Sequence, residues 1–402
     1  NGSTLNAFNG AKFTFSTKEE NTAPFMNNIN SFKDSLKFTI DTSLSGGDTF
    51  TIPTSPFENY NYDITTVDGY TANGITGDHT ITFPTGAGVH TISISGKFPK
   101  FNFNNLGDKD KITSVNKWGD IAYSLVQTNS FYGCSNLTSI ADDIDWINSV
   151  TNGTYMFYDC SLTELPIVML LDSLSYSEYM FGNNSLTTLP NGMTLAGITN
   201  GRSMFTDNSL DSLPISMTLS SLSNGDNMFN SNNLTTLPSS ITLSSLTRGS
   251  NMFGYNGIIS LHSGITLASL TNGDSMFIGN SLTTLPSGMT LGSLITSGQM
   301  FRDNSLTALP NGMTLEGLDN CGLMFYNNSL TALPNGMILD SLSNGSLMFY
   351  QNNLTALPSG MTLPNLTNGY GMFSGNSLTD LPSGMTLASL TNGFTIFNGN
   401  TI

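Results

Sequence analysis

The chain has 402 residues and a formal net charge of −16, with 28 acidic residues against 12 basic ones. Every lysine lies at or before Lys117, so the long C-terminal part has no basic stripe that could displace counterions from a nucleic acid. An anionic membrane would repel such a surface, and no stretch approaches the roughly 18 apolar residues of a membrane span. Composition therefore excludes nucleic-acid binding and direct membrane insertion.

The first 30 residues are rich in Asn, Gly, Ser and Thr. We predict an extended arm or attachment segment for residues 1–30, because such a composition buries little apolar surface. The chain begins with Asn1, which fits a processed N-terminus. Residues 1–30 contain no cysteine that could be lipidated, and no sorting tail is seen. Both observations favour attachment to an assembled particle or appendage.

Apolar and polar residues alternate in short segments over residues 31–104. The segments are 36–41, 49–53, 61–65, 79–84 and 89–95. A period of two predicts strands with one buried face, and glycine-containing turns between them favour antiparallel pairing. We therefore predict a small antiparallel β-sandwich over 31–104.

Parts of this region resemble the immunoglobulin-like domains of the polycystin-repeat type. The resemblance lies in segments 62–65, 77–83 and 88–94. The Trp-Asp-Phe-Gly-Asp-Gly stretch of that family is missing, and Thr-Thr-Val-Asp-Gly stands at residues 65–69 instead. The resemblance implies an immunoglobulin-like sandwich.

Residues 105–130 are predicted to be a junction and the N-terminal cap of a solenoid. Trp118 is expected to cover the open end of the first coil. Asp108 and Asp110 could contribute to a calcium loop, but the glycine and terminal Glu of an EF-hand are missing. A solvated turn is therefore the interpretation.

A phenylalanine recurs every 24 residues over the C-terminal part of the chain, and we call this series the Phe column. Its members are Phe157, Phe181, Phe205, Phe229, Phe253, Phe277, Phe301, Phe325, Phe349, Phe373 and Phe397. A fixed period of this kind predicts a stack of similar coils. We predict a solenoid of about eleven 24-residue repeats over 131–402, which makes the whole chain mainly β.

Within one repeat the apolar residues are too few to close a core, so neighbouring coils must bury one another. The Leu-x-x-Leu and Met-x-Leu segments are predicted to be short strands. Proline, as at Pro286, is expected to end the first strand because it has no N–H to donate. The Asn-Gly step, as at Asn272-Gly273, is expected to supply the positive φ of a tight turn.

An asparagine follows each Phe by three positions, and Cys134 and Cys160 hold this place in the earliest units. We interpret the asparagines as an inward structural ladder, in which each amide bonds the backbone of its own coil and of a neighbour. The alternative is a row of ligand-binding amides. The ladder residues are Asn184, Asn208, Asn232, Asn256, Asn280, Asn304, Asn328, Asn352 and Asn376. Cys134 and Cys160 are either bridged or, as we favour, two buried thiols.

The pattern Leu-x-x-Leu-Pro followed by Met-Phe-x-x-Asn/Cys resembles the leucine-rich repeats of BspA-type bacterial surface proteins. That family usually has Ala-Phe-x-x-Cys, and units 131–137 and 157–162 lie nearest to it. The resemblance covers roughly residues 121–402 and implies a leucine-rich-repeat solenoid. The ligand stays open, because such repeats serve adhesins, host-contact proteins and phage fibre components alike.

Between the two leucines of each Leu-x-x-Leu segment, the first residue is expected to point outward, while the second, as at Thr284, is expected to be half-buried. The outward threonines form the candidate recognition face: Thr187, Thr235, Thr283, Thr307, Thr331 and Thr355. A second threonine column allows a less favoured ice-binding hypothesis. It contains Thr194, Thr218, Thr242, Thr266, Thr290, Thr314, Thr362 and Thr386.

No nucleophile elbow, phosphate loop or metal-ligand spacing is found in the sequence, so we predict a non-enzymatic protein without cofactor or metal. The leading hypothesis is an extracellular protein on a virion, as a tail fibre or appendage, or on a bacterial cell. It would bind a host or cell-surface glycan or protein. A structural spacer or filament component is the alternative.

The last residues of the sequence provide a candidate terminal contact. Phe394 and Ile402 are apolar, and no capping helix or charged strand follows them. Because a solenoid end exposes apolar columns, we expect this end to be covered by neighbouring subunits of a homo-oligomer or by a larger particle.

Overall fold

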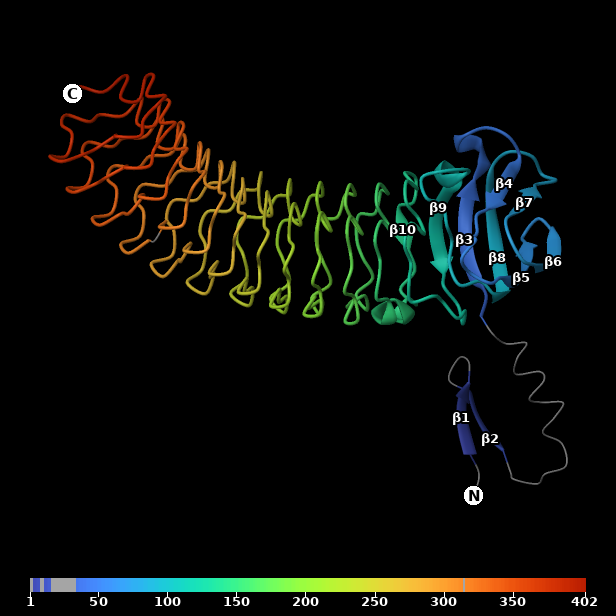
Figure 1. The fold of residues 1–402 in the computed structure, drawn as a ribbon. Helices are drawn as coiled ribbons and strands as arrows, with labels where there is room; N and C mark the ends of the chain where they lie inside the picture. The colour runs from blue at the N-terminus through green and yellow to red at the C-terminus, as the bar shows by residue number, and fades with distance from the viewer. Residues whose placement is uncertain (1–2, 8–10, 16–33, 314) are drawn as a thin grey trace.

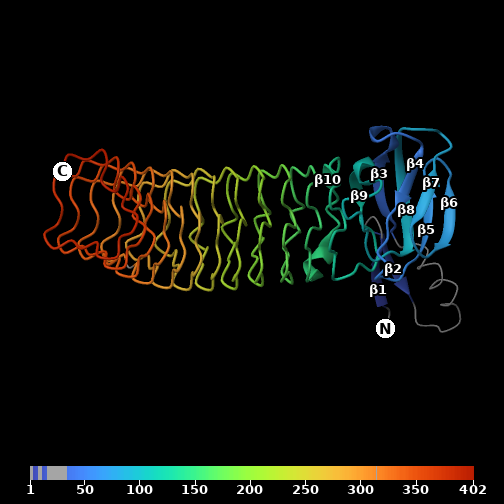
Figure 2. The same ribbon diagram turned by 45° about the horizontal axis from the view of Figure 1, so that its top comes forward.

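The computed structural model describes residues 3–7, 11–15, 34–313 and 315–402. These residues form strands, single-residue bridges and turns, with no α-helix. The short 3-10 helices are η2 (Thr42–Leu44), η3 (Lys109–Lys111) and η4 (Asp145–Ser149). The predicted mainly β class is confirmed in this sense. An elongated stack of coils leads away from a group of sheets and bends toward the C-terminus (Figures 1 and 2).

The segment predicted as an arm, residues 1–30, contains two described strands. β1 (Ser3–Ala7) pairs antiparallel with β2 (Ala11–Phe15). The rest of that segment lies outside the described residues.

Two further sheets follow. The larger has the strand order β10-β9-β3-β8-β5-β6, and the smaller pairs β4 with β7. The bounds are β3 (Leu36–Asp41), β4 (Thr49–Ile52), β5 (Asn61–Thr66), β6 (Thr71–Ile75), β7 (His79–Thr82), β8 (Val89–Lys97), β9 (Ile112–Lys117) and β10 (Ser139–Ile140). All pairs are antiparallel except β9 with β10.

The two sheets share an aromatic core. Alternate residues of β3 are fully buried, as the period of two requires. The ring of Phe38 on β3 lies 6.0 Å from that of Phe50 on β4 and 5.3 Å from that of Phe101. Burial raises the pKa of Tyr60 to about 12, so its hydroxyl stays protonated and donates to the carbonyl of Lys100.

The segment predicted as a junction and cap, residues 105–130, also contains a strand. β9 lies within residues 105–130, and it pairs with β3 on one side and with β10 of the first coil on the other. Trp118 follows β9 and is buried, with its ring 5.9 Å from that of Phe131 in an edge-to-face arrangement. The first coil therefore stacks directly on the edge of the larger sheet (Figure 1).

The solenoid is organised by the Phe column. From Phe157 onward, successive rings stack with centroids 5.6–5.7 Å apart and interplanar angles of 4–11°. Backbone bonds follow the same direction, since the N–H of Phe277 donates to the carbonyl of Met300 in the next coil at 2.9 Å. Buried residues from Leu36 to Leu378 form one continuous hydrophobic core.

The predicted Leu-x-x-Leu and Met-x-Leu strands are wrong. In the described coils that follow β10, parallel pairing is limited to single-residue bridges, such as Asn272 with Thr296. The N–H of Leu282 donates to the side-chain oxygen of Asn304 at 3.0 Å rather than to a carbonyl. Pro286 has no N–H, and its carbonyl begins a turn by accepting from the N–H of Met289. A regular strand ladder is therefore interrupted twice within a few residues.

The expected Asn-Gly turn is also wrong. The positive φ falls two residues after the glycine, for example at Ser275 with φ of 58°. At the glycine itself the packing is close: a Cβ on Gly225 would lie 2.9 Å from the Met252 sulfur and 3.1 Å from a methyl group of Leu222. Ser177, Ser297 and Cys321 take the same place in other coils and are buried, so the position accepts small residues. A small residue at the place of Gly225 lets the methionine of the next coil reach the core.

Candidate recognition surfaces

The candidate recognition face is exposed along the solenoid. All six of its threonines are exposed, and the leucines on either side, such as Leu282 and Leu285, are buried. Thr284, expected to be half-buried, is exposed as well. The reason is that the backbone between the two leucines does not follow a strand, so both intervening residues face solvent.

Because both positions face solvent, Thr283→Lys and Thr284→Lys should each change the free energy of unfolding by no more than about 0.5 kcal/mol. Denaturant melts of the two variants beside the parent protein would measure this. A loss of stability confined to Thr284→Lys would mean that this side chain is buried in solution.

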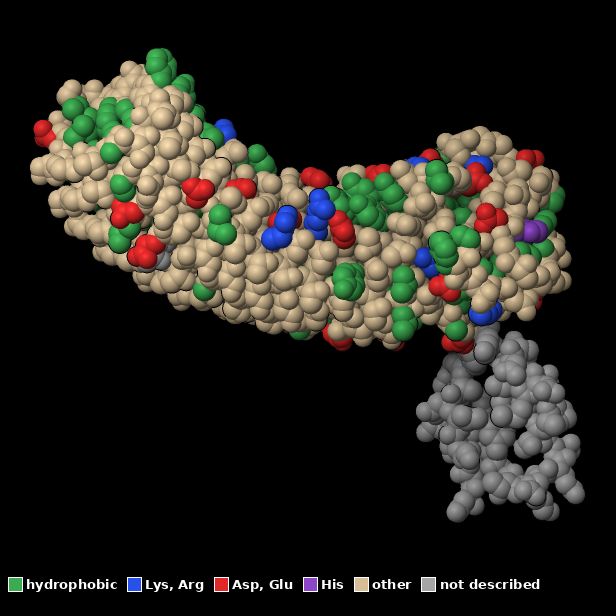
Figure 3. All heavy atoms as spheres, viewed as in Figure 1, with side chains coloured by type: hydrophobic (Ala, Val, Ile, Leu, Met, Phe, Trp, Pro, Cys, Tyr) green, Lys and Arg blue, Asp and Glu red, His purple; other side chains and the backbone are tan. Residues whose placement is uncertain are grey.

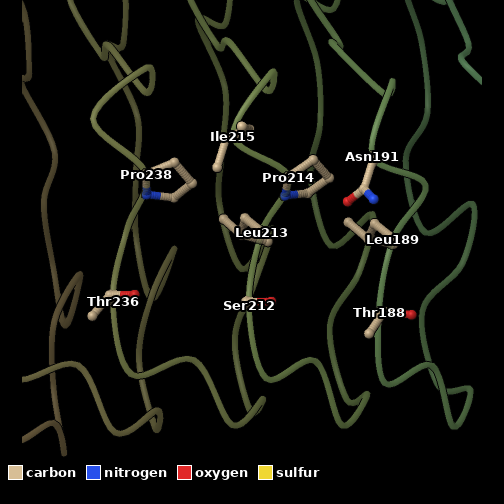
Figure 4. A pocket seen from close by; sticks show the side chains of 9 residues that line it. All are labelled: Thr188, Leu189, Asn191, Ser212, Leu213, Pro214, Ile215, Thr236 and Pro238. Carbon is tan, nitrogen blue, oxygen red and sulfur yellow. The ribbon is translucent and has the colours of Figure 1, made fainter.

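A shallow pocket of about 330 Å³ lies beside this face. Its walls come from three successive coils, with hydroxyl side chains in one row and leucine and proline side chains in the next (Figure 4). Ile215 stands at the rim and is 86% exposed. The side chains that line the pocket are Thr188, Leu189, Asn191, Ser212, Leu213, Pro214, Ile215, Thr236 and Pro238.

The asparagine ladder is occupied by backbone groups. The Asn280 amide nitrogen lies 2.9 Å from the carbonyl of Phe253 in the preceding coil and 3.1 Å from that of Phe277 in its own coil. Its amide oxygen accepts from the N–H of Ile258 at 3.0 Å. All nine ladder residues repeat this arrangement. Their amides are therefore engaged inside the solenoid and are not presented to a ligand.

The cysteines are buried free thiols. Cys160 takes the ladder place, and its sulfur lies 3.2 Å from the Phe131 carbonyl, so it replaces one of the bonds that asparagine makes. Burial raises the pKa of Cys134, Cys160 and Cys321. The reactive thiolate is thus disfavoured at each position.

We therefore expect Ellman's reagent to react slowly with the folded protein. After unfolding in guanidinium chloride without reductant, it should react with three thiols per chain. The absorbance of the released thiolate reports both values. A count of one thiol after unfolding would show that Cys134 and Cys160 are bridged.

Tyrosines flank the Phe column and form a surface that was not expected from the sequence; we call it the aromatic edge. Its first cluster contains Tyr132, Tyr155, Tyr158 and Tyr179, with ring centroids 4.9–5.5 Å apart. The guanidinium of Arg202 lies 6.0 Å above the Tyr179 ring and pairs with Glu178 at 3.2 Å. Figure 3 shows hydrophobic side chains gathered on the concave edge of the solenoid, beside basic and acidic ones.

The second cluster of the aromatic edge lies six coils further along. The Tyr326 and Tyr350 rings stack at 5.1 Å with an angle of 14°, and the Arg302 guanidinium lies 4.9 Å from the Tyr326 ring. A pocket of about 320 Å³ adjoins them. It is lined by Tyr326, Leu347, Tyr350, Tyr370, Ser374, Thr395 and Asn398. The sequence feature that could have indicated this cluster is a tyrosine directly after Phe in two neighbouring units, at Tyr326 and Tyr350.

The candidate terminal contact is exposed, with Phe394 at 70% and Ile402 at 55%. The Phe394 ring stacks on that of Tyr370 at 6.0 Å, which extends the second tyrosine cluster. Its use as a contact between subunits stays a prediction.

Within the described residues, no group of three or more His, Cys, Asp or Glu side chains is arranged to hold a metal ion. His90 instead takes part in packing: its ring stacks on that of Phe83, and its Nδ1 lies 2.6 Å from the Asp68 carboxylate. None of the helices in the described part of the chain has the length and apolar character needed to cross a bilayer.

Comparison with known families agrees with the geometry of the coils. The family described as "BspA type Leucine rich repeat region (6 copies)" matches residues 89–187, 120–235 and 150–283. The repeats are similar to BspA-type leucine-rich repeats. The matched segments end at residue 283, yet the Phe rings continue to Phe397 with unchanged spacing, so the later coils follow the same plan. No curated protein sequence matches the chain.

Proposed function

We propose that this chain is a non-enzymatic recognition protein, displayed outside the cell on a virion or a bacterial surface. In this proposal an immunoglobulin-like sandwich carries a rigid BspA-like solenoid, which binds a surface molecule through its exposed threonine row. The single observation that carries the proposal is the row itself. All six threonines of the candidate recognition face are exposed on coils that stack in register.

Regular stacking suits this role for a physical reason. Each coil is held by ring stacking and by backbone bonds to the next coil, so the threonine hydroxyls keep fixed spacings. Preorganised groups lose little conformational entropy when they bind. The similarity to BspA-type repeats, which are common in surface adhesion proteins, supports the same role.

Two alternatives remain in view. A spacer or filament component would use the same rigidity without a ligand. Ice binding would use the second threonine column, in which Thr290 is exposed while Thr194 is half-exposed; Thr314 lies outside the described residues. An ice-binding plane needs a matching threonine two residues along, where Gly292 stands instead of Thr in the unit of Thr290. Thermal hysteresis in a freezing assay would favour this alternative.

The test uses labelled protein on a panel of bacterial and host cells, before and after periodate or protease treatment of the cells. Periodate-sensitive binding indicates a glycan and protease-sensitive binding a protein. We expect the triple variant Thr283→Lys, Thr307→Lys, Thr331→Lys to bind at least tenfold more weakly. The matched control Ser245→Lys, Ser293→Lys, Ser341→Lys adds the same charge at exposed positions outside the threonine row and should bind normally. Absence of binding to every surface would favour the spacer alternative.

A further inference from the structure

We propose that the pocket of the second tyrosine cluster binds one neutral sugar ring of a glycan, which stacks on Tyr350. This inference rests on the proposed recognition function and adds a site and a ligand class to it. The site lies on the aromatic edge, apart from the threonine row.

The pocket lies where two stacked columns change to small residues in the same coil. The column that follows Phe reads Arg302, Tyr326, Tyr350, Ser374, Asn398, so the bulky series stops at Ser374. The column two residues before Phe reads Leu323, Leu347, Gly371, Thr395, and the Leu347 side chain lies over Gly371, where a Cβ would be 2.7 Å from a Leu347 methyl carbon. Gly371 and Ser374 both belong to the coil of Phe373. The pocket beside Ser374 has a volume of about 320 Å³, at the lower end of the roughly 300–1,000 Å³ typical of small-molecule sites.

The aromatic wall is held in place before any ligand arrives. One face of Tyr326 meets the Arg302 guanidinium at 4.9 Å, and its other face stacks on Tyr350 at 5.1 Å. The next residue of that column is the small Ser374, which leaves the far side of Tyr350 open toward the pocket. Tyr370 lines another wall, and its ring stacks on that of Phe394.

The chemistry of the lining selects the ligand. A sugar ring has an apolar C–H face that packs on an aromatic ring and hydroxyls at its edge that need hydrogen-bonding groups. Ser374, Thr395 and Asn398 line the same pocket as the tyrosines and provide hydroxyl and amide groups.

None of the residues that line the pocket is charged. The nearest basic group, Arg302, already bonds Asp303 at 3.0 Å and Gln299 at 2.8 Å. A carboxylate in the pocket would therefore lose hydration without gaining a cationic partner. This disfavours sialylated and other acidic sugars and favours neutral ones.

The test begins with a glycan array that carries neutral oligosaccharides and their sialylated counterparts. Titration calorimetry with the best neutral oligosaccharide then compares variants of the full chain. Tyr350→Ala should weaken binding at least tenfold. Ser374→Tyr should do the same while Tyr350 stays in place, because it continues the tyrosine column into the pocket. Tyr255→Ala removes a tyrosine that is exposed in another coil and should bind as the parent does; melting curves confirm that each variant is folded.

Neutral glycans bound equally by the parent, Tyr350→Ala and Ser374→Tyr would overturn the pocket proposal, as would a preference for sialylated glycans. If cells are bound through the threonine row but no arrayed glycan is bound, the pocket proposal fails and the recognition function stands. If neither cells nor glycans are bound, both proposals fail.

Discussion

Replacing Phe277 by alanine should lower the free energy of unfolding by about 3–5 kcal/mol, the range for large-to-small changes of buried aromatic residues. The ring is fully buried and stacks at 5.7 Å on Phe253 and at 5.7 Å on Phe301. Its removal leaves a cavity in the middle of the Phe column, because both neighbouring rings are fixed by the coils beyond them. Denaturant unfolding with hydrogen exchange on the flanking coils would measure the loss.

Two controls define this result. Phe277→Leu should lose less, because it refills part of the cavity, and Thr283→Ala in the same coil should be neutral, since that side chain is exposed. A loss below about 1 kcal/mol for Phe277→Ala would mean that neighbouring side chains collapse into the space. Because a solenoid unfolds through neighbour interactions, exchange should rise most in the two adjoining coils.

Asn280→Ala should be the second severe change, with a loss of free energy of unfolding of about 1–3 kcal/mol. The amide donates to carbonyls of two coils and accepts the N–H of Ile258. Both carbonyls keep a second ladder amide as donor, so alanine would leave the buried N–H of Ile258 unpaired. Each unpaired buried group costs about 1–3 kcal/mol. The measurement is the same unfolding experiment, carried out beside Thr283→Ala.

The natural sequence supplies a graded variant for this position. Asn280→Cys should fall between alanine and asparagine, because Cys160 already shows one sulfur contact to a carbonyl at the corresponding place. Equal melting of Asn280→Ala and the parent protein would contradict the structural role and revive the ligand-binding alternative for the ladder.

The period of the Phe residues was sufficient to predict stacking, because a side chain recurring at 24 residues must meet its own copy in the next coil. The conformation within a coil was harder to predict. A glycine after asparagine can meet a requirement of the backbone or make room for a neighbouring side chain, and the sequence does not distinguish the two. At Gly225 the neighbouring side chain is that of Met252. Likewise, the Leu-x-x-Leu pattern does not reveal that Asn304 of the next coil takes the N–H of Leu282.

The two surfaces differ in how visible they are in a sequence. The threonines of the candidate recognition face recur in many units, so they stand out when the units are aligned. The pocket on the aromatic edge depends on departures from the repeat, namely Ser374 and Thr395, which line it together with Tyr350. Averaging over units removes these departures. Only the stacked structure shows that they fall side by side.

The pairing of β9 with β10 also has a consequence for the sheet. A strand at the edge of a sheet carries unpaired N–H and C=O groups that recruit strands from other molecules. Here the first coil occupies that edge, with Ser139 opposite Ser114 and Ile140 opposite Val115. A chain truncated after residue 130 would expose both the edge of β9 and the ring of Trp118. The solenoid therefore also covers the β9 edge of the larger sheet and keeps it from pairing with other molecules, independently of any ligand.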